Sequence, residues 1–100
     1  MKSDFYKEVY ELLLDIPYGK VTTYARIGEL LGNRRYARAA GNALHANPDG
    51  EKYPCYKVVN SKGRLSDNYA FGGIEAQKKR LEADGIEVID YKVDLIKYGH

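Results

Sequence analysis

The sequence predicts a mainly α, single-domain protein of the winged helix-turn-helix type, with one small β hairpin or wing, over residues 1–100. Three observations predict this class. Apolar residues recur at helical spacing in separate segments of the chain. A tight glycine-containing turn joins two of the predicted helices. A valine pair followed by turn-forming residues predicts a strand that reverses its direction.

The first predicted helix covers residues 4–16, with Ser3 or Asp4 as its cap. Pro17-Tyr18-Gly19 predicts a turn at its end, and Val21-Thr22 a short extended segment. Five side chains at helical spacing form the apolar face of the helix: Phe5, Val9, Leu12, Leu13 and Ile16.

A helix-turn-helix pair is predicted next. The first helix spans Tyr24–Leu31, with Thr23 as its N-cap and Gly32 directly after its end. The second spans roughly Arg34–Ala46 and stops before Asn47-Pro48, because a residue that precedes proline resists the α conformation. This second helix is rich in alanine, so a backbone or a ligand can approach it closely.

The second half of the chain predicts one hairpin and one helix. Tyr53–Val59 is strand-like at its end, residues 60–63 predict a turn, and Arg64-Leu65 the start of a return strand. Residues 66–73 predict a loop, and Ile74–Asp84 a helix. We expect three charged residues to form a solvated face of this helix: Lys78, Lys79 and Arg80.

The charge is distributed unevenly along the chain. The net formal charge of the protein is +2, but residues 16–66 alone carry a net charge of +6. A basic region of this kind is typical of a phosphate-binding face and equally of an ordinary solvated surface, so charge alone leaves both interpretations open.

The composition excludes several classes of protein. A hydrophobic fraction of 44% with 30% charged residues is that of a folded domain rather than a disordered one. No apolar run is long enough to span a bilayer, and the first residues predict no secretory signal. The single cysteine excludes an internal disulfide and a cysteine-histidine zinc cluster, so we expect no metal and a cytoplasmic location.

One motif is far more specific than these patterns. Pro54-Cys55-Tyr56-Lys57-Val58-Val59 resembles the Pro-Cys-His-Arg-Val-Val signature of the O6-alkylguanine-DNA alkyltransferases. Further blocks match the helix-turn-helix region and active-site loop of that family in order: residues 21–27, 32–33, 37–44, 47–48, 63–66 and 70–73. The match covers the DNA-binding half of the full-length members, and residues 93–98 are similar to the ending of the short alkyltransferase-like subgroup.

The resemblance implies a DNA repair protein that binds the minor groove of duplex DNA and turns an O6-alkylguanine into a pocket. Arg38 matches the finger that enters the base stack, Tyr24 the aromatic residue that rotates the phosphate, and Cys55 the alkyl acceptor. We expect no cofactor, a monomer, and excision-repair proteins as possible partners. The candidate DNA-binding or lesion-binding residues are Tyr24, Arg34, Arg35, Arg38, Asn47, Lys57, Val58, Tyr69, Phe71 and Gly72.

The residues beside the cysteine depart from the family pattern. Tyr56 replaces the histidine that takes the thiol proton, and Asp84 best matches the glutamate that orients this histidine. Cys55, Tyr56 and Asp84 are therefore the candidate catalytic residues, although a core aromatic role for Tyr56 is favoured. Lys57 replaces arginine and lacks its planar fork. Because tyrosine is a poor base near pH 7, Cys55 is predicted to be a weak nucleophile.

Three functions stay open from the sequence. The protein is a single-turnover transferase that moves the alkyl group irreversibly to Cys55, or a recogniser that leaves removal to other proteins. The alkyltransferase-like proteins are recognisers of this kind and usually lack the cysteine. A helix-turn-helix transcriptional regulator is the third class, but such a protein needs side chains that read the major groove, and alanine dominates the second helix.

Overall fold

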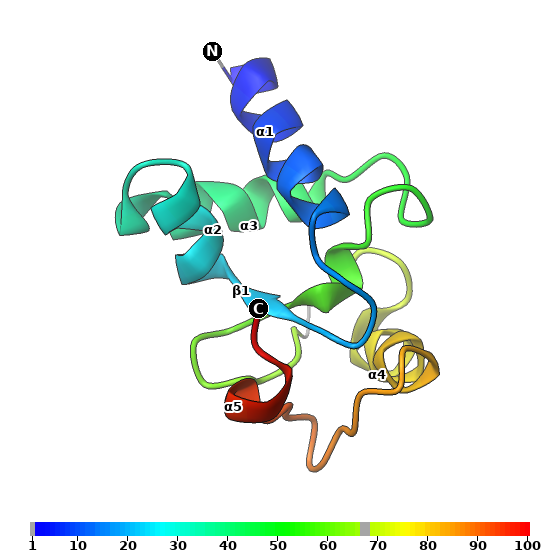
Figure 1. Cartoon of the computed structure of the whole chain (residues 1–100). Helices are drawn as coiled ribbons and strands as arrows, with labels where there is room; N and C mark the ends of the chain where they lie inside the picture. The colour runs from blue at the N-terminus through cyan, green and yellow to red at the C-terminus, as the bar shows by residue number, and fades with distance from the viewer. Residues whose placement is uncertain (1, 67–68) are drawn as a thin grey trace.

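The computed structural model describes residues 2–66 and 69–100, and the predicted loop of residues 66–73 therefore lies partly outside the described residues. Three helices form one half of the molecule, and the segment with Cys55 lies between this half and the C-terminal part of the chain (Figure 1). The elements are α1 (Lys2–Leu14), β1 (Thr22–Thr23), α2 (Tyr24–Leu30), η1 (Arg34–Tyr36), α3 (Ala37–His45), η2 (Cys55–Lys57), β2 (Val58–Val59), α4 (Gly73–Ala83) and α5 (Leu95–Tyr98).

The helix-turn-helix pair forms as predicted, with one adjustment. The side chain of Thr23 caps α2 by accepting a hydrogen bond of 3.1 Å from the Arg26 amide. The second predicted helix starts as the 3-10 turn η1, where the side chain of Asn33 accepts from the Arg35 amide at 2.9 Å. Gly28 lets the two helices approach closely, since a Cβ there would lie 2.9 Å from the Ala37 backbone nitrogen.

The alanines of α3 bring α1 close to it. Ala40 and Ala43 are fully buried against the core, together with Val9 and Leu13 of α1. The Tyr10 hydroxyl crosses from α1 and donates a hydrogen bond of 2.8 Å to the Ala43 carbonyl. Small side chains on α3 therefore allow α1 to pack closely against it, and the Tyr10 hydrogen bond fixes the position of one helix along the other.

The mainly α class is confirmed, but the predicted β hairpin is wrong. The valines of β2 pair with β1 in parallel, in the register Thr22↔Val58. The turn does close, because the Asn60 amide donates to the Arg64 carbonyl at 3.0 Å, but the antiparallel pairing ends there. Both valines of β2 are buried, and burial on both sides is typical of parallel strands, whose connection here runs through α2 and α3.

The predicted return strand, Arg64-Leu65, pairs with the C-terminal tail instead of with β2. Arg64 forms an antiparallel bridge with Lys92, and the Leu65 amide donates to the Tyr91 carbonyl at 2.9 Å. The tail then forms the short helix α5, which the sequence reading did not predict, and ends beside Val21. Among the described residues, the helices are too short or too polar to cross a membrane.

Gly63 is the position at which the packing of the C-terminal tail can be tested by substitution. Its φ is +84°, and a Cβ there would collide with the Val93 carbonyl oxygen. Gly63→Ala should lower the free energy of unfolding by about 3 kcal/mol or more, because it combines backbone strain with this collision. The measurement is urea denaturation followed by circular dichroism.

Gly73→Ala is the matched control for this variant. Gly73 has a φ of +79°, but a Cβ there has nothing within 4 Å. The free energy of unfolding of this variant should therefore fall by only about 1 kcal/mol, from backbone strain alone. Equal losses in the two variants would contradict the role given to the Val93 contact.

Candidate functional site

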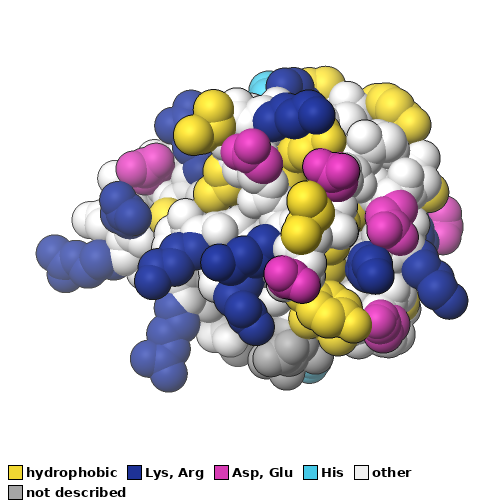
Figure 2. Space-filling view, turned by 90° about the horizontal axis from the view of Figure 1, so that it is seen from below, with side chains coloured by type: hydrophobic (Ala, Val, Ile, Leu, Met, Phe, Trp, Pro, Cys, Tyr) yellow, Lys and Arg dark blue, Asp and Glu magenta, His cyan; other side chains and the backbone are white. Residues whose placement is uncertain are grey.

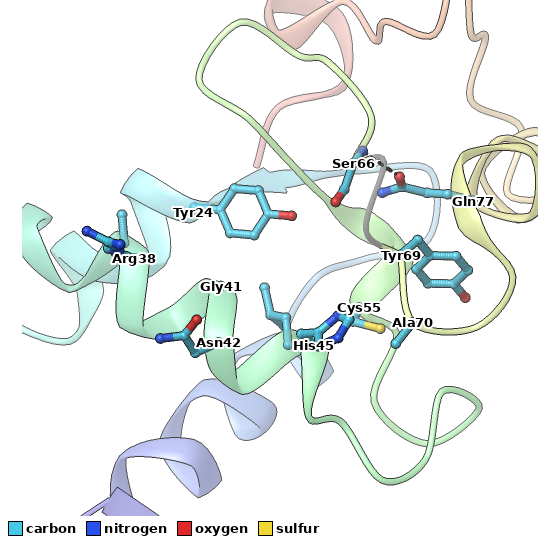
Figure 3. A pocket seen from close by; sticks show the side chains of 12 residues that line it. Tyr24, Arg38, Gly41, Asn42, His45, Cys55, Ser66, Tyr69, Ala70 and Gln77 are labelled. Carbon is cyan, nitrogen blue, oxygen red and sulfur yellow. Dashed lines mark hydrogen bonds between the residues drawn. The ribbon is translucent and has the colours of Figure 1, made fainter.

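A pocket of about 740 Å³ opens between α3 and the segment that carries Cys55 (Figure 3). Tyr24 extends over this pocket from the start of α2, and Tyr69 and Ala70 face it from the opposite side, just before α4. The residues that line the pocket are Tyr24, Ala37, Arg38, Gly41, Asn42, Leu44, His45, Cys55, Ser66, Tyr69, Ala70 and Gln77.

Cys55 lies in the wall of this pocket and is only 6% exposed. Its sulfur points toward the Tyr69 and Ala70 side (Figure 3). Burial raises the pKa of the Cys55 thiol, and a hydrogen bond from the Asn47 side chain, a backbone hydrogen bond and the charge of Arg80 oppose this rise only in part. Because the pKa lies above the ordinary value, the thiol is protonated near neutral pH.

Tyr56 turns away from the pocket and into the protein. Its hydroxyl donates a hydrogen bond of 3.0 Å to Asp84 Oδ1, so Asp84 lies where the resemblance implies, against the residue after the cysteine. Burial and this bond to the negatively charged Asp84 raise the pKa of Tyr56 to about 12. Tyr56 is therefore neutral and committed to Asp84, and it does not serve as a base for Cys55.

Lys57 and Val58, two of the predicted DNA or lesion contacts, are both buried. The Lys57 side chain is 6% exposed, and its Nζ lies 3.1 Å from Asp84 Oδ2 and donates to the Pro17 carbonyl at 3.0 Å. Lys57 can fill this place because its charge is compensated by the largely buried carboxylate of Asp84, whose side chain is 14% exposed. Val58 is buried in the core, and its carbonyl accepts from Gln77 Nε2 at 3.2 Å.

Asn47 is also buried, and it acts on the site from behind Cys55. Its Nδ2 donates to the Tyr53 carbonyl at 2.8 Å, and its Oδ1 accepts from the Asp49 amide at 3.0 Å. These two bonds close the loop that leads into Cys55. Asn47 therefore shapes this loop, and its contact with DNA stays a prediction.

Four of the remaining predicted residues come from the helix-turn-helix. Tyr24 and Arg38 line the pocket, while Arg34 and Arg35 are exposed in η1, one turn before α3. Figure 2 shows a face of the molecule on which Lys and Arg side chains gather over one half. The exposed positions of Arg34 and Arg35 fit a phosphate-binding surface.

Tyr69 forms one side of the pocket, and Phe71 packs against it. Tyr69 lines it and is buried, while Phe71 packs edge-on against Tyr69 with ring centroids 5.8 Å apart. Phe71 does not line the pocket, and its ring also lies against Gly50, where a Cβ would come within 2.9 Å of it. Gly72 precedes α4 with a φ of +123°, so it sets the start of the helix.

Several residues at or near the pocket were not among the predicted ones, and Gln77, His45 and Arg80 are the three discussed next. Gln77 is buried and lines the pocket floor, and His45 lines its wall at the end of α3. Arg80, expected on a solvated face, places its Cζ 4.7 Å from the Tyr56 ring centroid. The sequence does carry a signal for Arg80, since the spacing of Gln77, Arg80 and Asp84 puts all three on one helix face.

The fold and site together define a DNA-binding domain with a cysteine pocket beside its helix-turn-helix. The family model described as 6-O-methylguanine DNA methyltransferase, DNA binding domain, matches residues 4–86. The chain therefore belongs to this family. It is 39% identical over 101 residues to alkyltransferase-like protein 1 of Schizosaccharomyces pombe, covering 95% of this chain and 93% of that protein.

Two further comparisons agree. A DNA base-flipping protein of Vibrio parahaemolyticus is 40% identical over 95 residues, which cover 94% of this chain and 93% of that protein. The structure of S. pombe Atl1 in complex with damaged DNA containing O6-carboxymethylguanine superposes with a TM-score of 0.87 at 38% identity. That match covers 98% of this chain and 95% of the other.

The raised pKa of Cys55 has a measurable consequence. Only the thiolate reacts with iodoacetamide, so the reaction rate should climb through a midpoint above that of a free cysteine thiol, whose pKa is about 8.5. The measurement is a pH profile of the alkylation rate of Cys55 in the folded protein, with glutathione as the small-thiol control. A midpoint at or below that of glutathione would contradict the assignment.

Proposed function

We propose that this protein recognises O6-alkylguanine in duplex DNA by turning the nucleotide into the Cys55 pocket, and that it holds the base without removing the alkyl group. The observation that carries the proposal is the composition of the pocket. It contains the acceptor cysteine of the family, but the residue that supplies the base in the transferases is here a tyrosine that is bonded to Asp84 and turned away.

DNA binding would use the α2–α3 pair. Arg38 stands at the pocket rim, where it can enter the base stack, and Arg34 and Arg35 precede it on the exposed side. Tyr24 lies beside the opening, with its ring 3.8 Å from the position of a Cβ on Gly41. Extruding a base costs on the order of a few kcal/mol, which an inserted side chain and a closely fitting pocket can offset.

The pocket suits a flipped purine. Tyr24 and Tyr69 offer aromatic surface on two sides, and the small residues Gly41 and Ala70 leave room between them. Stacking on an aromatic ring contributes about 1–3 kcal/mol per base. The site therefore supplies binding contacts that do not depend on any reaction of the thiol.

Transfer to Cys55 is the second candidate function. The thiol lies in the pocket wall, and Asn47 and Arg80 each lower its pKa, although burial has the larger and opposite effect. In such a transfer the thiolate sulfur forms a bond to the alkyl carbon as the bond from that carbon to guanine O6 breaks. The electron pair and a proton then end on the guanine. The thioether is stable, so each molecule would act once.

Arg38→Ala should weaken binding to an O6-methylguanine duplex by about tenfold or more, because the variant loses the group that holds the stack open. Lys78→Ala is the matched control, because it also removes one positive charge. Lys78 lies on α4, outside the pocket, and packs against the ring of Tyr91. Fluorescence anisotropy at fixed salt measures both variants. A larger loss in the Lys78 variant would remove Arg38 from this role.

Intact-mass spectrometry distinguishes the two candidate functions. After incubation with an O6-methylguanine duplex, the protein should bind but gain no methyl group. Tyr56→His should gain one on Cys55, because a histidine at this position can be oriented by Asp84, as the family mechanism requires. A methyl gain on Cys55 in the unaltered protein would instead establish transfer. Equal affinity for modified and plain duplexes would contradict both functions.

A further inference from the structure

The pocket has a chemically distinct end beside the Cys55 sulfur. The sulfur faces Tyr69 and Ala70, on the side of the pocket away from Tyr24 (Figure 3). If the flipped guanine occupies the pocket as proposed above, its O6 substituent lies at this end, because the cysteine at this position of the family lies next to the O6 substituent. The inference below rests on that proposed function and concerns which substituents this end accepts.

Arg80 is not among the residues that line the pocket, but its guanidinium packs against the residue that follows Cys55. Its guanidinium stacks over the ring of Tyr56, the residue after Cys55, with Cζ 4.7 Å from the ring centroid. Burial raises the pKa values of both Cys55 and Tyr69, and the charge of Arg80 opposes the rise at each of them. The field of one guanidinium therefore acts on both residues that flank the substituent.

The present partner of Arg80 is easily exchanged. Arg80 Nη1 lies 3.0 Å from Glu51 Oε1, but the Glu51 side chain is 85% exposed and that of Arg80 is 35% exposed. Exposed ion pairs contribute little to stability. The loop around Glu51 does not depend on the pair, because Asp49 Oδ1 accepts from the amides of Glu51 and Lys52 at 3.1 Å. Glu51 can rotate into solvent while the loop keeps its shape.

We propose that Arg80 makes the pocket selective for O6 substituents that carry a negative charge, over neutral substituents of the same size. The carboxylate of a substituent such as carboxymethyl replaces Glu51 as the partner of the guanidinium. Arginine and carboxylate match in a planar pair of hydrogen bonds. A base that fills the pocket also displaces water, which strengthens this pair relative to the exposed one.

The test compares matched adducts in one duplex sequence. Duplexes with O6-carboxymethylguanine, O6-carbamoylmethylguanine, O6-methylguanine or plain guanine are titrated with the protein and followed by fluorescence anisotropy. The carbamoylmethyl group has the shape of carboxymethyl without its charge. The unaltered protein should bind the carboxymethyl duplex about tenfold more tightly than the carbamoylmethyl duplex.

The variants assign this preference to Arg80. Arg80→Gln should abolish the difference between the two adducts and leave the preference for O6-methylguanine over guanine in place. Glu51→Gln should widen the difference, because it frees the guanidinium. Lys79→Gln is the control, since it removes the same charge from an exposed position of the same helix and should change nothing.

Two results would overturn the proposal: no preference for carboxymethyl in the unaltered protein, or a preference that persists in Arg80→Gln. If Arg80→Gln does not fold by circular dichroism, Glu51→Gln decides, and an unchanged difference there overturns it. Failure of the proposed function looks different. In that case no modified duplex is bound more tightly than plain DNA, and the selectivity of Arg80 is refuted together with it.

Discussion

The buried amide of Gln77 is the interaction on which the site depends. Its Oε1 accepts from the Ser66 amide at 2.8 Å, and its Nε2 donates to the carbonyls of Tyr56 and Val58 at 3.0 and 3.2 Å. One side chain of α4 thus satisfies three backbone groups from the cysteine segment and the loop that faces it. Unpaired groups of this kind are costly in a protein interior, so the pocket floor keeps one geometry.

Around this floor, charge is arranged in two layers. Beneath Cys55, Asp84 is shared between the Tyr56 hydroxyl and the Lys57 ammonium, and it is committed to structure. Near the pocket, Arg80 stacks over the Tyr56 ring and forms an ion pair with the exposed Glu51. Asp84, which could have served proton transfer, is already bonded within the protein, whereas Arg80 can exchange its exposed partner for a ligand. This division favours recognition over chemistry.

The sequence predicted what depends on local spacing and failed where burial decides. The periodic apolar residues of α1 and the Thr23 cap were sufficient to place the first helices, and the cysteine motif located the pocket. The partner of β2 was wrong, because a buried valine pair fits either a parallel or an antiparallel neighbour. The surroundings of Lys57 and Arg80 were not predictable for a related reason. Charged residues are expected at the surface, and neither the carboxylate that pairs with Lys57 nor the ring beneath Arg80 is adjacent to it in sequence.

The pairing of the tail with Val21 also constrains the order of folding. The Val21 amide donates to the Tyr98 carbonyl, and its carbonyl accepts from the His100 amide, each at 2.8 Å. During synthesis, the edge beside β1 therefore stays unsatisfied until residue 100 has left the ribosome. The helix-turn-helix can form early from contacts close in sequence, whereas closure of this edge needs residues 98–100 and comes later. A nascent chain would thus expose its β edge to chaperones after its DNA-binding helices have already formed.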